Sequence, residues 1–285
     1  MALLIDVGDD GWMSNQELYD ALRPHLPDAD LRCTPDIGDP ADVVMLAVSR
    51  LTPGLAGTLP NLQLVQKLGA GIETIVAAPD LPPQVRVARL RPQTPAREIA
   101  EYCLAVVLQH HRHLPFHTRH QARAEWVVRA PDEAPETTVG VLGLGHIGGQ
   151  TARLFAALDF RVIGWSRTEK RIESIDCRHG DAALRPMLGD CDYVVAVLPS
   201  TPATRDLFDA DLLAAMKPGA VLVNVGRREP LPPEHAFWCH PKVKITPHVS
   251  GWHLGSAGFK DAAENYNRLR DGRPLLNEID RAAGY

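Results

Sequence analysis

Residues 138–150 read TVGVLGLGHIGGQ, and this stretch decides the fold. An apolar β run leads into glycines 143, 145 and 148, and a helical pattern follows them. Between a strand and a helix, G-x-G-x-x-G is a dinucleotide-binding motif. Gly143 permits the tight turn, Gly145 lets a pyrophosphate approach the backbone, and Gly148 lets helix and strand pack closely. The alternative is a glycine-rich turn without a ligand, but the helix N-terminus favours bound phosphates.

The turn after the next strand indicates which dinucleotide binds. Chains that bind NAD end this strand, about 20 residues after the glycines, in an acid that holds the ribose 2′-OH. Here residues 164–170 read GWSRTEK, and the nearest acid, Glu169, falls too late. Ser166, Arg167 and Thr168 can instead hydrogen-bond a 2′-phosphate, with charge assistance from the arginine. We therefore expect NADP, the alternative being an exposed basic turn.

The sequence around the motif predicts two α/β domains. Continuous apolar runs at 161–166, 193–199 and 220–226 alternate with helical segments, which is typical of a parallel sheet covered on both faces. Residues 1–95 also alternate short apolar runs with turns, and include a helical pattern at 15–26. Residues 96–113 have apolar residues at helical spacing and predict a long buried helix that connects the two domains.

Bulk composition excludes several classes of protein. At 285 residues the chain is long for a single core, and its 45% hydrophobic and 23% charged residues are those of a globular protein. A net charge of -5 argues against nucleic-acid binding, and no apolar run approaches the roughly 18 residues of a membrane span. Five scattered cysteines are typical of reduced thiols, so we expect a cytoplasmic protein.

Several further stretches carry a resemblance to a known family. They read KLGAGIETI (67–75), AEYCLAVVL (100–108), VLPSTPATRDLF (197–208), LLAAMKPGAVLVNVGR (212–227) and REPLPPEHAFWCHPKVKITPHVSG (228–251). Together with the glycine motif, they make the chain resemble the D-isomer-specific 2-hydroxyacid dehydrogenases. Within that family it is most similar to the NADP-preferring glyoxylate/hydroxypyruvate reductases.

The resemblance implies a fold and an assembly. It implies two Rossmann-like domains with parallel sheets and an active site in the cleft between them. Residues 1–97 and 252–285 would form the substrate-binding domain, and residues 98–251 the NADP-binding domain. The family commonly forms homodimers through the cofactor domain, so a homodimer is expected.

The resemblance also implies the chemistry, which is NADPH-dependent reduction of small 2-oxo acids such as glyoxylate and hydroxypyruvate to D-2-hydroxy acids. His248 would act as the general acid, and Glu229 would orient its ring and favour the protonated form. Arg227 would bind the 2-oxo acid and polarise its carbonyl. Backbone N–H groups at Leu68, Gly69, Ala70 and Gly71 would hold the substrate carboxylate, and Trp252 would line the cleft. The expected cofactor-binding residues are Gly143, Leu144, Gly145, His146, Ile147, Gly148, Trp165, Ser166, Arg167, Thr168, Leu198, Pro199, Thr204, Val225, Gly226 and Gly251.

One stretch, NVGRREPLPP (224–233), departs from the family pattern. The family separates the catalytic arginine and glutamate by a helix and a strand, whereas Arg227 and Glu229 are two residues apart here. Because an α–β unit of a parallel sheet begins and ends at the same edge, its loss can be closed by a short link. Either the next apolar run, KVKITPH (242–248), then pairs with VLVNVG, or a gap exposes apolar surface.

Three readings of function stay open at this level. The first is the reductase, and the second is a catalytically impaired NADP(H)-binding paralogue with a binding or sensing role, suggested by the shortened segment. The third is a formate- or phosphite-type dehydrogenase, which the missing acid near Ser166 disfavours. A run of histidines (His110, His113, His117 and His120) has spacing that can bind a metal, but Pro115 interrupts the helix, so we expect a solvated helix end and no metal.

Overall fold

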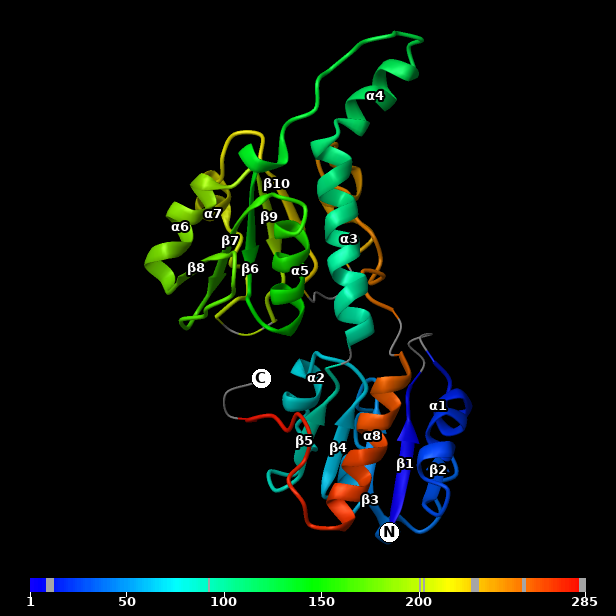
Figure 1. The fold of residues 1–285 in the computed structure, drawn as a ribbon. Coiled ribbons are helices and arrows are strands. Elements are labelled where there is room, and N and C mark those ends of the chain that lie inside the picture. Colours follow the sequence, from blue (N-terminus) through cyan, green and yellow to red (C-terminus); the bar gives the residue numbers. More distant parts are fainter. Residues whose placement is uncertain are drawn as a thin grey trace. The chain divides into compact units, whose positions relative to one another are not determined.

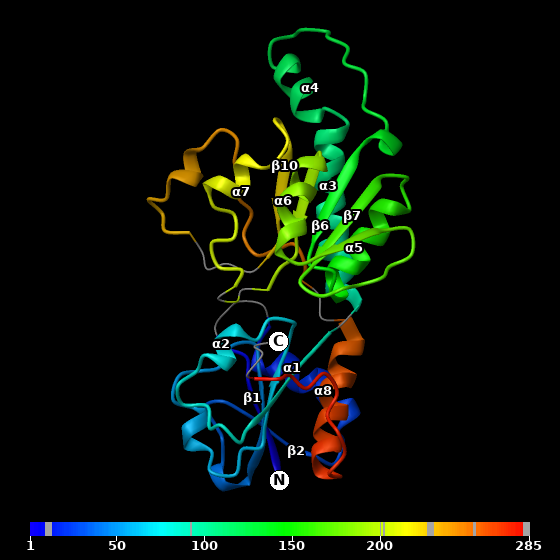
Figure 2. The same ribbon diagram turned by 90° about the vertical axis from the view of Figure 1, so that its left-hand side faces the viewer.

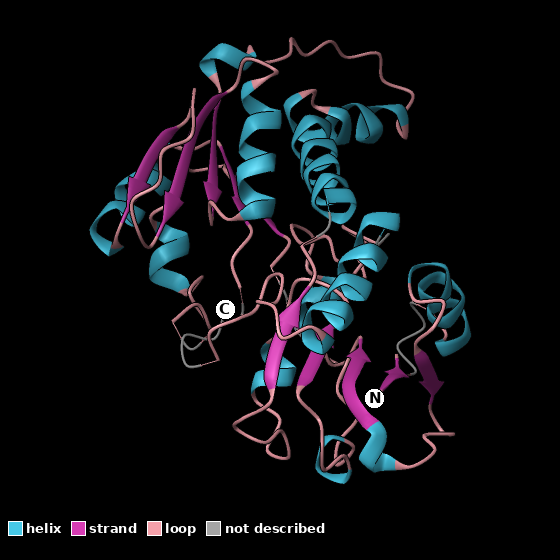
Figure 3. Cartoon of the chain, turned by 60° about the horizontal axis from the view of Figure 1, so that its bottom comes forward, coloured by secondary structure: helices cyan, strands magenta, loops and turns pink. Residues whose placement is uncertain are grey.

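A computed structural model describes residues 1–8, 13–91, 93–199, 201, 203–226, 231–252 and 255–281. The chain divides into two compact units. Unit 1 comprises Met1–Thr94 and Trp252–Tyr285, and unit 2 comprises Pro95–Gly251. The strands form one sheet in each unit, and helices flank both sheets (Figure 3). Every strand pair in both sheets is parallel, so the predicted fold class of two parallel α/β units is confirmed.

The sheet of unit 1 has the strand order β2-β1-β3-β4-β5 among the described residues. Chain order passes from β1 to β2 on one side and then to β3, β4 and β5 on the other, so the switch point lies between β1 and β3. The strands are β1 (Ala2–Asp6), β2 (Asp30–Cys33), β3 (Val43–Val48), β4 (Leu64–Lys67) and β5 (Arg86–Arg89). The helices are α1 (Asn15–Leu22), α2 (Glu73–Val76) and α8 (Gly255–Arg270), with 3-10 turns η1 (Arg23–His25), η2 (Pro40–Asp42) and η3 (Ala56–Thr58).

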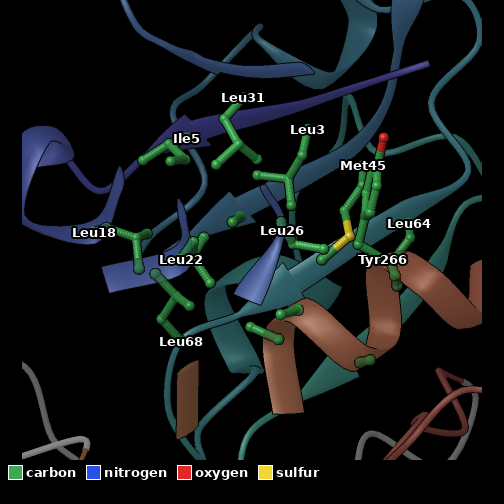
Figure 4. Close-up of a cluster of buried hydrophobic side chains, with 14 of the residues drawn as sticks. Leu3, Ile5, Leu18, Leu22, Leu26, Leu31, Met45, Leu64, Leu68 and Tyr266 are labelled. Carbon is green, nitrogen blue, oxygen red and sulfur yellow. The ribbon is translucent and has the colours of Figure 1, made fainter. Parts of the chain in front are cut away.

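Alternating residues of these strands enter two separate apolar clusters, because successive side chains point to opposite faces. Leu3 and Ile5 join a cluster with α1 and α8, where Figure 4 shows Leu18, Leu22 and Tyr266 around the strand residues. Leu4 and its neighbours on the other face pack against residues around α2. Figure 2 accordingly shows α2 and α8 on opposite sides of this sheet. Both faces are covered, as expected for a parallel sheet.

The C-terminal part of the chain completes unit 1 through buried polar contacts. Asn265 of α8 donates from Nδ2 to Oε1 of Gln66 at 2.7 Å, and both side chains are fully buried. The Gln66 amide in turn donates to the carbonyl of Lys67 at 3.1 Å. Arg86 forms an ion pair with Glu278 at 2.5 Å, which holds the final segment on β5. Residues from both ends of the sequence therefore share one core.

The sheet of unit 2 has the strand order β10-β9-β6-β7-β8 among the described residues. The strands are β6 (Thr138–Leu142), β7 (Arg161–Ser166), β8 (Asp176–His179), β9 (Tyr193–Ala196) and β10 (Val221–Asn224). The helices are α3 (Gln93–His111), α4 (Leu114–Gln121), α5 (His146–Ala156), α6 (Asp181–Asp190) and α7 (Ala210–Ala214), with 3-10 turns η4 (Ala134–Glu136) and η5 (Ala236–Cys239). The switch point lies between β6 and β9, because β7 and β8 extend the sheet on one side and β9 and β10 on the other.

Helices cover both faces of this sheet (Figure 1). Cys103 and Val107 of α3 pack with Phe155 of α5 against one face. Met187 of α6 and Leu212 of α7 pack against the other face. The long helix predicted at 96–113 is thus confirmed as α3, and the glycine motif is confirmed as the connection between β6 and α5.

Strand β10 is the outermost strand on its side of the sheet among the described residues, so the first of the two alternatives, in which KVKITPH pairs with it, does not hold. Residues 242–248 form no strand and pack against α3 instead. Because β10 lacks a covering neighbour, Val221 and Leu222 are only partly buried, whereas Tyr193 and Val194 beside them on β9 are buried. The chain therefore follows the other expected course, with an open sheet edge.

Candidate functional site

Each of the three glycines after β6 occupies a position where the absence of a side chain has a different steric consequence. Gly143 has φ +97°, and its N–H donates to the carbonyl of Trp165 at 2.8 Å. A Cβ atom added at Gly148 would lie 1.8 Å from the carbonyl oxygen of Gly143, so helix α5 packs directly on the turn. A Cβ atom added at Gly145 would meet nothing within 4 Å. Gly145 therefore borders open space at the position where the motif expects a pyrophosphate.

The N-terminus of α5 has the features of an anion site. Gly145 is the N-cap and offers no side chain to the first amides of the helix. Those amides have no intrahelical partner and carry the positive end of the helix dipole. The Nε2 atom of His146 is buried and has no hydrogen-bond partner among the residues that the structure describes. Leu144 is buried against Gly164 of β7, and Ile147 accepts a hydrogen bond from Thr151, so both stabilise the turn. The residues present fit a dinucleotide phosphate.

The turn after β7 exposes its basic and hydroxyl residues. Arg167 and Thr168 are exposed, whereas Ser166 is buried and its hydroxyl donates to the carbonyl of Thr168 at 2.8 Å. Trp165 is also buried, and its Nε1–H donates to the carbonyl of Gly180 at 2.9 Å. Trp165 and Ser166 therefore fix the shape of the turn, while Arg167 and Thr168 are accessible to a phosphate.

The remaining predicted cofactor residues follow β9 and β10, at the same carboxyl edge. The N–H of Val225 donates to the carbonyl of Ala196 at 3.0 Å, which continues the pairing of the two strands. Gly226 approaches the carbonyl of Leu198 closely, since an added Cβ would lie 3.0 Å from it. The Thr204 hydroxyl donates to the carbonyl of Pro199 and accepts the N–H of Thr201 at 2.9 Å. The turns after β6, β7, β9 and β10 thus all lie at one sheet edge, around the switch point.

His248 lies in the irregular segment that runs along α3. Lys244 donates to Gln109 at 3.3 Å, and Thr246 shares a hydrogen bond of 3.0 Å with the hydroxyl of Tyr102. Farther along, an added Cβ at Gly251 would lie 2.7 Å from Ile99, so only glycine permits this approach. The segment therefore runs antiparallel to α3, and His248 is exposed on it. Gly251, predicted as a cofactor residue, has a packing role here.

Two of the three predicted catalytic residues, Arg227 and Glu229, lie outside the described residues. Trp252 begins the second segment of unit 1 and is 45% exposed. The histidine run lies at the end of α3 and in α4. Within it, His113 lies 3.6 Å from Asp132 and His120 lies 3.7 Å from Glu125.

The loop after β4 offers three amides to a ligand. The predicted amide of Leu68 does not belong with them, because its N–H already donates to the carbonyl of Val48 at 2.8 Å. The amides of Gly69, Ala70 and Gly71 have no acceptor among the residues that the structure describes. Gly69 has φ +140°, a conformation that favours glycine. Successive backbone amides of this kind form a concave anion-binding nest.

Sequence reasoning missed two basic residues beside this nest. Lys67 ends β4 and is only 4% exposed, and Arg89 ends β5 at the paired position. The available signal was a basic residue at the end of each of two neighbouring buried strands, because such residues are rarely buried without a partner.

Two absences complete the description. No group of histidine, cysteine or acidic side chains among the described residues could hold a metal ion. Within the same residues, no helix combines the length and apolar character that crossing a membrane requires.

Unit 2 contains a doubly wound parallel sheet with a glycine turn and a helix N-terminus at its switch point. These features define a dinucleotide-binding domain. Comparisons with known proteins agree. Residues 104–228, within unit 2, match the family model described as D-isomer specific 2-hydroxyacid dehydrogenase, NAD binding domain.

Whole-chain relatives extend this result to unit 1. Glyoxylate/hydroxypyruvate reductase A of Serratia proteamaculans (strain 568) is 30% identical over 95% of this chain and 96% of its own length. A D-isomer specific 2-hydroxyacid dehydrogenase from Xanthobacter autotrophicus Py2, solved with NADPH and MES, is 34% identical. It aligns with a TM-score of 0.92 over 100% of this chain and 99% of its own.

An NADPH-dependent glyoxylate/hydroxypyruvate reductase from Sinorhizobium meliloti, solved with NADP and sulfate, aligns with a TM-score of 0.89. It is 29% identical, and the alignment covers 100% of this chain and 99% of that chain. The protein belongs to the D-isomer specific 2-hydroxyacid dehydrogenase family.

Proposed function

We propose that the protein is an NADPH-dependent reductase of small 2-oxo acids such as glyoxylate and hydroxypyruvate, with D-2-hydroxy acids as products. The observation that carries the proposal is the open space at Gly145, at the N-terminus of α5, together with the end of β7, where an exposed Arg167 follows Ser166 and no carboxylate ends the strand. The names of the relatives support the substrate class. The nest at residues 69–71 also suits a substrate that carries a carboxylate.

In this proposal each unit has one task. Unit 2 binds NADPH through the turns after β6, β7, β9 and β10, and bound NADPH supplies the hydride for the carbonyl carbon. Unit 1 holds the substrate carboxylate with the amides of Gly69, Ala70 and Gly71. His248 delivers the proton to the carbonyl oxygen, because an imidazole exchanges protons near neutral pH. Arg227 and Glu229 keep the roles that the family resemblance implies, polarising the carbonyl and orienting His248.

Substitution of His248 tests the mechanism directly. NADPH oxidation is followed by absorbance with glyoxylate and hydroxypyruvate, and His248→Gln should lower kcat by about 100- to 10,000-fold. NADPH affinity should stay within about twofold, because His248 lies on the segment along α3 and outside the glycine turn. His235→Gln is the control, since this half-buried histidine caps the 3-10 turn η5 and should leave kcat unchanged. Full activity in His248→Gln would reject the general-acid role.

A second candidate is an NADP(H)-binding protein without turnover. The observation that favours it is the irregular course of residues 242–248, which replaces the expected strand immediately before His248. This candidate predicts tight NADPH binding and no oxidation with any short 2-oxo acid. Substituting His248 would then change no measured property. A single turnover assay with bound NADPH separates the two candidates.

We also propose a homodimer that forms through unit 2. The segment at 122–133, which follows α4, exposes Trp126 by 97% and Val128 by 83%. Large apolar side chains so exposed are typical of an interaction surface. Trp126→Ser should convert a dimer into a monomer in light scattering after gel filtration. Leu158→Ser, which alters an exposed apolar residue elsewhere in unit 2, is the control and should leave the mass unchanged.

We place the protein in the cytoplasm. All five cysteines are unpaired in the structure, as expected in a reducing compartment. Titration of the unfolded protein, isolated without added reductant, should yield five thiols, and a smaller number would contradict this placement.

A further inference from the structure

Two cationic side chains lie beside the nest at residues 69–71. Lys67 is buried and Arg89 is half-buried. The Lys67 ammonium donates to the carbonyl of Ser49 and lies 3.5 Å from the carbonyl oxygen of Leu68. Arg89 donates from Nη1 to the carbonyl oxygen of Ala70 at 3.2 Å. Lys67 and Arg89 are paired residues of neighbouring parallel strands, so both emerge at the same point of the carboxyl edge.

These cations orient the peptide units of the loop. In a trans peptide the C=O and the N–H point in opposite directions. Lys67 attracts the carbonyl of Leu68, so the N–H of Gly69 points away from the ammonium. Arg89 attracts the carbonyl of Ala70, so the N–H of Gly71 points away from the guanidinium.

The middle peptide unit is fixed by the backbone itself. The carbonyl of Gly69 accepts the N–H of Leu90 at 3.1 Å, which leaves the N–H of Ala70 on the opposite side. Three consecutive carbonyls are therefore held by donors from Lys67, Arg89 and Leu90, at the ends of β4 and β5, and the three matching amides are left for a ligand. An added Cβ at Gly69 would lie 3.7 Å from Nζ of Lys67, so the ammonium lies directly beside the nest.

We propose that Lys67 and Arg89 are positioning residues for the carboxylate of the substrate, an inference that rests on the proposed 2-oxo acid reductase function. They hold the amides of residues 69–71 outward, and their two positive charges make the nest selective for an anion. A neutral compound with the same carbonyl gains nothing from these charges. The pair therefore sets substrate charge selectivity, and acts through the loop without touching the reacting atoms.

Charge selectivity is what separates this role from a purely structural one. Lys67→Met keeps the length of the side chain and removes the ammonium. We expect kcat/KM for glyoxylate to fall by about 10- to 100-fold, mainly through KM, because hydrogen bonds to charged groups are worth that much. For methyl glyoxylate, the uncharged ester, kcat/KM should stay within about threefold. Equal losses for both substrates, or no loss for glyoxylate, would overturn the inference.

Two further variants control for an effect of misfolding. Arg89→Met removes the second cation from a half-buried position and should produce the same charge-selective loss, smaller than that of Lys67→Met. Arg86→Met removes a cation from the other end of β5, where it pairs with Glu278, and should leave the ratio of the two substrates unchanged. A changed ratio in Arg86→Met would count against the proposal.

Oxalate binding gives a reading that does not depend on turnover. Calorimetric titration of the NADP-loaded protein should show oxalate binding that weakens at least about tenfold in Lys67→Met and is unchanged in Arg86→Met. If the wild type turns over glyoxylate but the variants match it, this inference fails alone. If turnover is absent but oxalate binding depends on Lys67, the proposed function fails and the positioning role stands. If the wild type neither reduces glyoxylate nor binds oxalate, both fail.

Discussion

The glycine turn of unit 2 allows a prediction in which stability and nucleotide binding change independently. Gly148→Ala places a Cβ 1.8 Å from the carbonyl oxygen of Gly143, and Cβ contacts below 3.0 Å are essentially never observed. The two atoms must separate by 1.2 Å, the difference between these distances, and the obstacle is backbone. We expect the upper end of the usual overpacking penalty, about 3 kcal/mol, and a melting temperature lower by about 6–12 °C.

Gly145→Ala should show the opposite behaviour. The added methyl meets nothing within 4 Å and the extended backbone at this residue suits alanine, so the free protein loses at most about 1 kcal/mol through the weaker N-cap. The methyl does occupy the space that a pyrophosphate would enter. Loss of one charge-assisted amide contact should weaken NADPH binding by about 10- to 150-fold.

Gly149→Ala is the matched control on the same helix. Its Cβ would lie 3.6 Å from Arg153 and 3.7 Å from Ile172, which are ordinary contacts. Alanine in a helix interior should add about 0.5–1 kcal/mol of stability and leave the NADPH Kd unchanged. Thermal unfolding without nucleotide and fluorescence titration with NADPH measure both quantities. Wild-type NADPH affinity in Gly145→Ala, or a wild-type melting temperature in Gly148→Ala, would refute the assignment of the turn.

Three further predictions concern the rest of the fold. Arg167→Glu should raise the Kd of NADPH by about 100-fold and that of NADH less than fivefold in fluorescence titrations, and equal changes would contradict a 2′-phosphate contact. Burial lowers the pKa of His111 below its usual 6.5, so its contribution to stability is present above that value and is lost as pH falls toward the folded-state pKa. His111→Leu should therefore flatten the decrease in Tm between about pH 7 and 5, and a wild-type slope would exclude this residue as the cause. Asn265→Leu leaves the buried side-chain oxygen of Gln66 without its donor. It should therefore lower the unfolding free energy of unit 1 by about 2–3 kcal/mol in denaturant titration. Asn267→Leu on the same helix is the control and should change this free energy by less than about 0.5 kcal/mol.

Much of the fold follows from apolar periodicity. The runs that contain β1, β3, β6, β9 and β10 are almost continuously apolar because both faces of each sheet are covered. The runs of β4 and β5 predict strands from their apolar residues, although each also carries polar and basic residues. The edge strand β8 was missed because it reads DCRH, which has no apolar run. Helix α6 was missed because Pro186 interrupts its pattern, although Met187 and Leu188 after the proline are fully buried.

The candidate site likewise has a part that the sequence predicts and a part that it does not. The steric roles of Gly143, Gly145 and Gly148 agree with those expected from spacing alone, because a turn between strand and helix has few solutions. The orientation of the peptide units at residues 69–71 was not readable from sequence. It depends on Arg89, at the end of β5, and on Leu90 after it, which lie about 20 residues further along the chain.

The sequence by itself determined the two parallel α/β units, the phosphate turn and the basic turn after β7, since each depends on residues that are neighbours along the chain. The tertiary structure alone decided the open edge at β10, the packing of residues 242–251 on α3, and the placement of Lys67 and Arg89 beside the nest. It decided them because pairing between distant strands sets which carbonyl meets which donor. That pairing is fixed by packing across the sheet, and no local pattern records it.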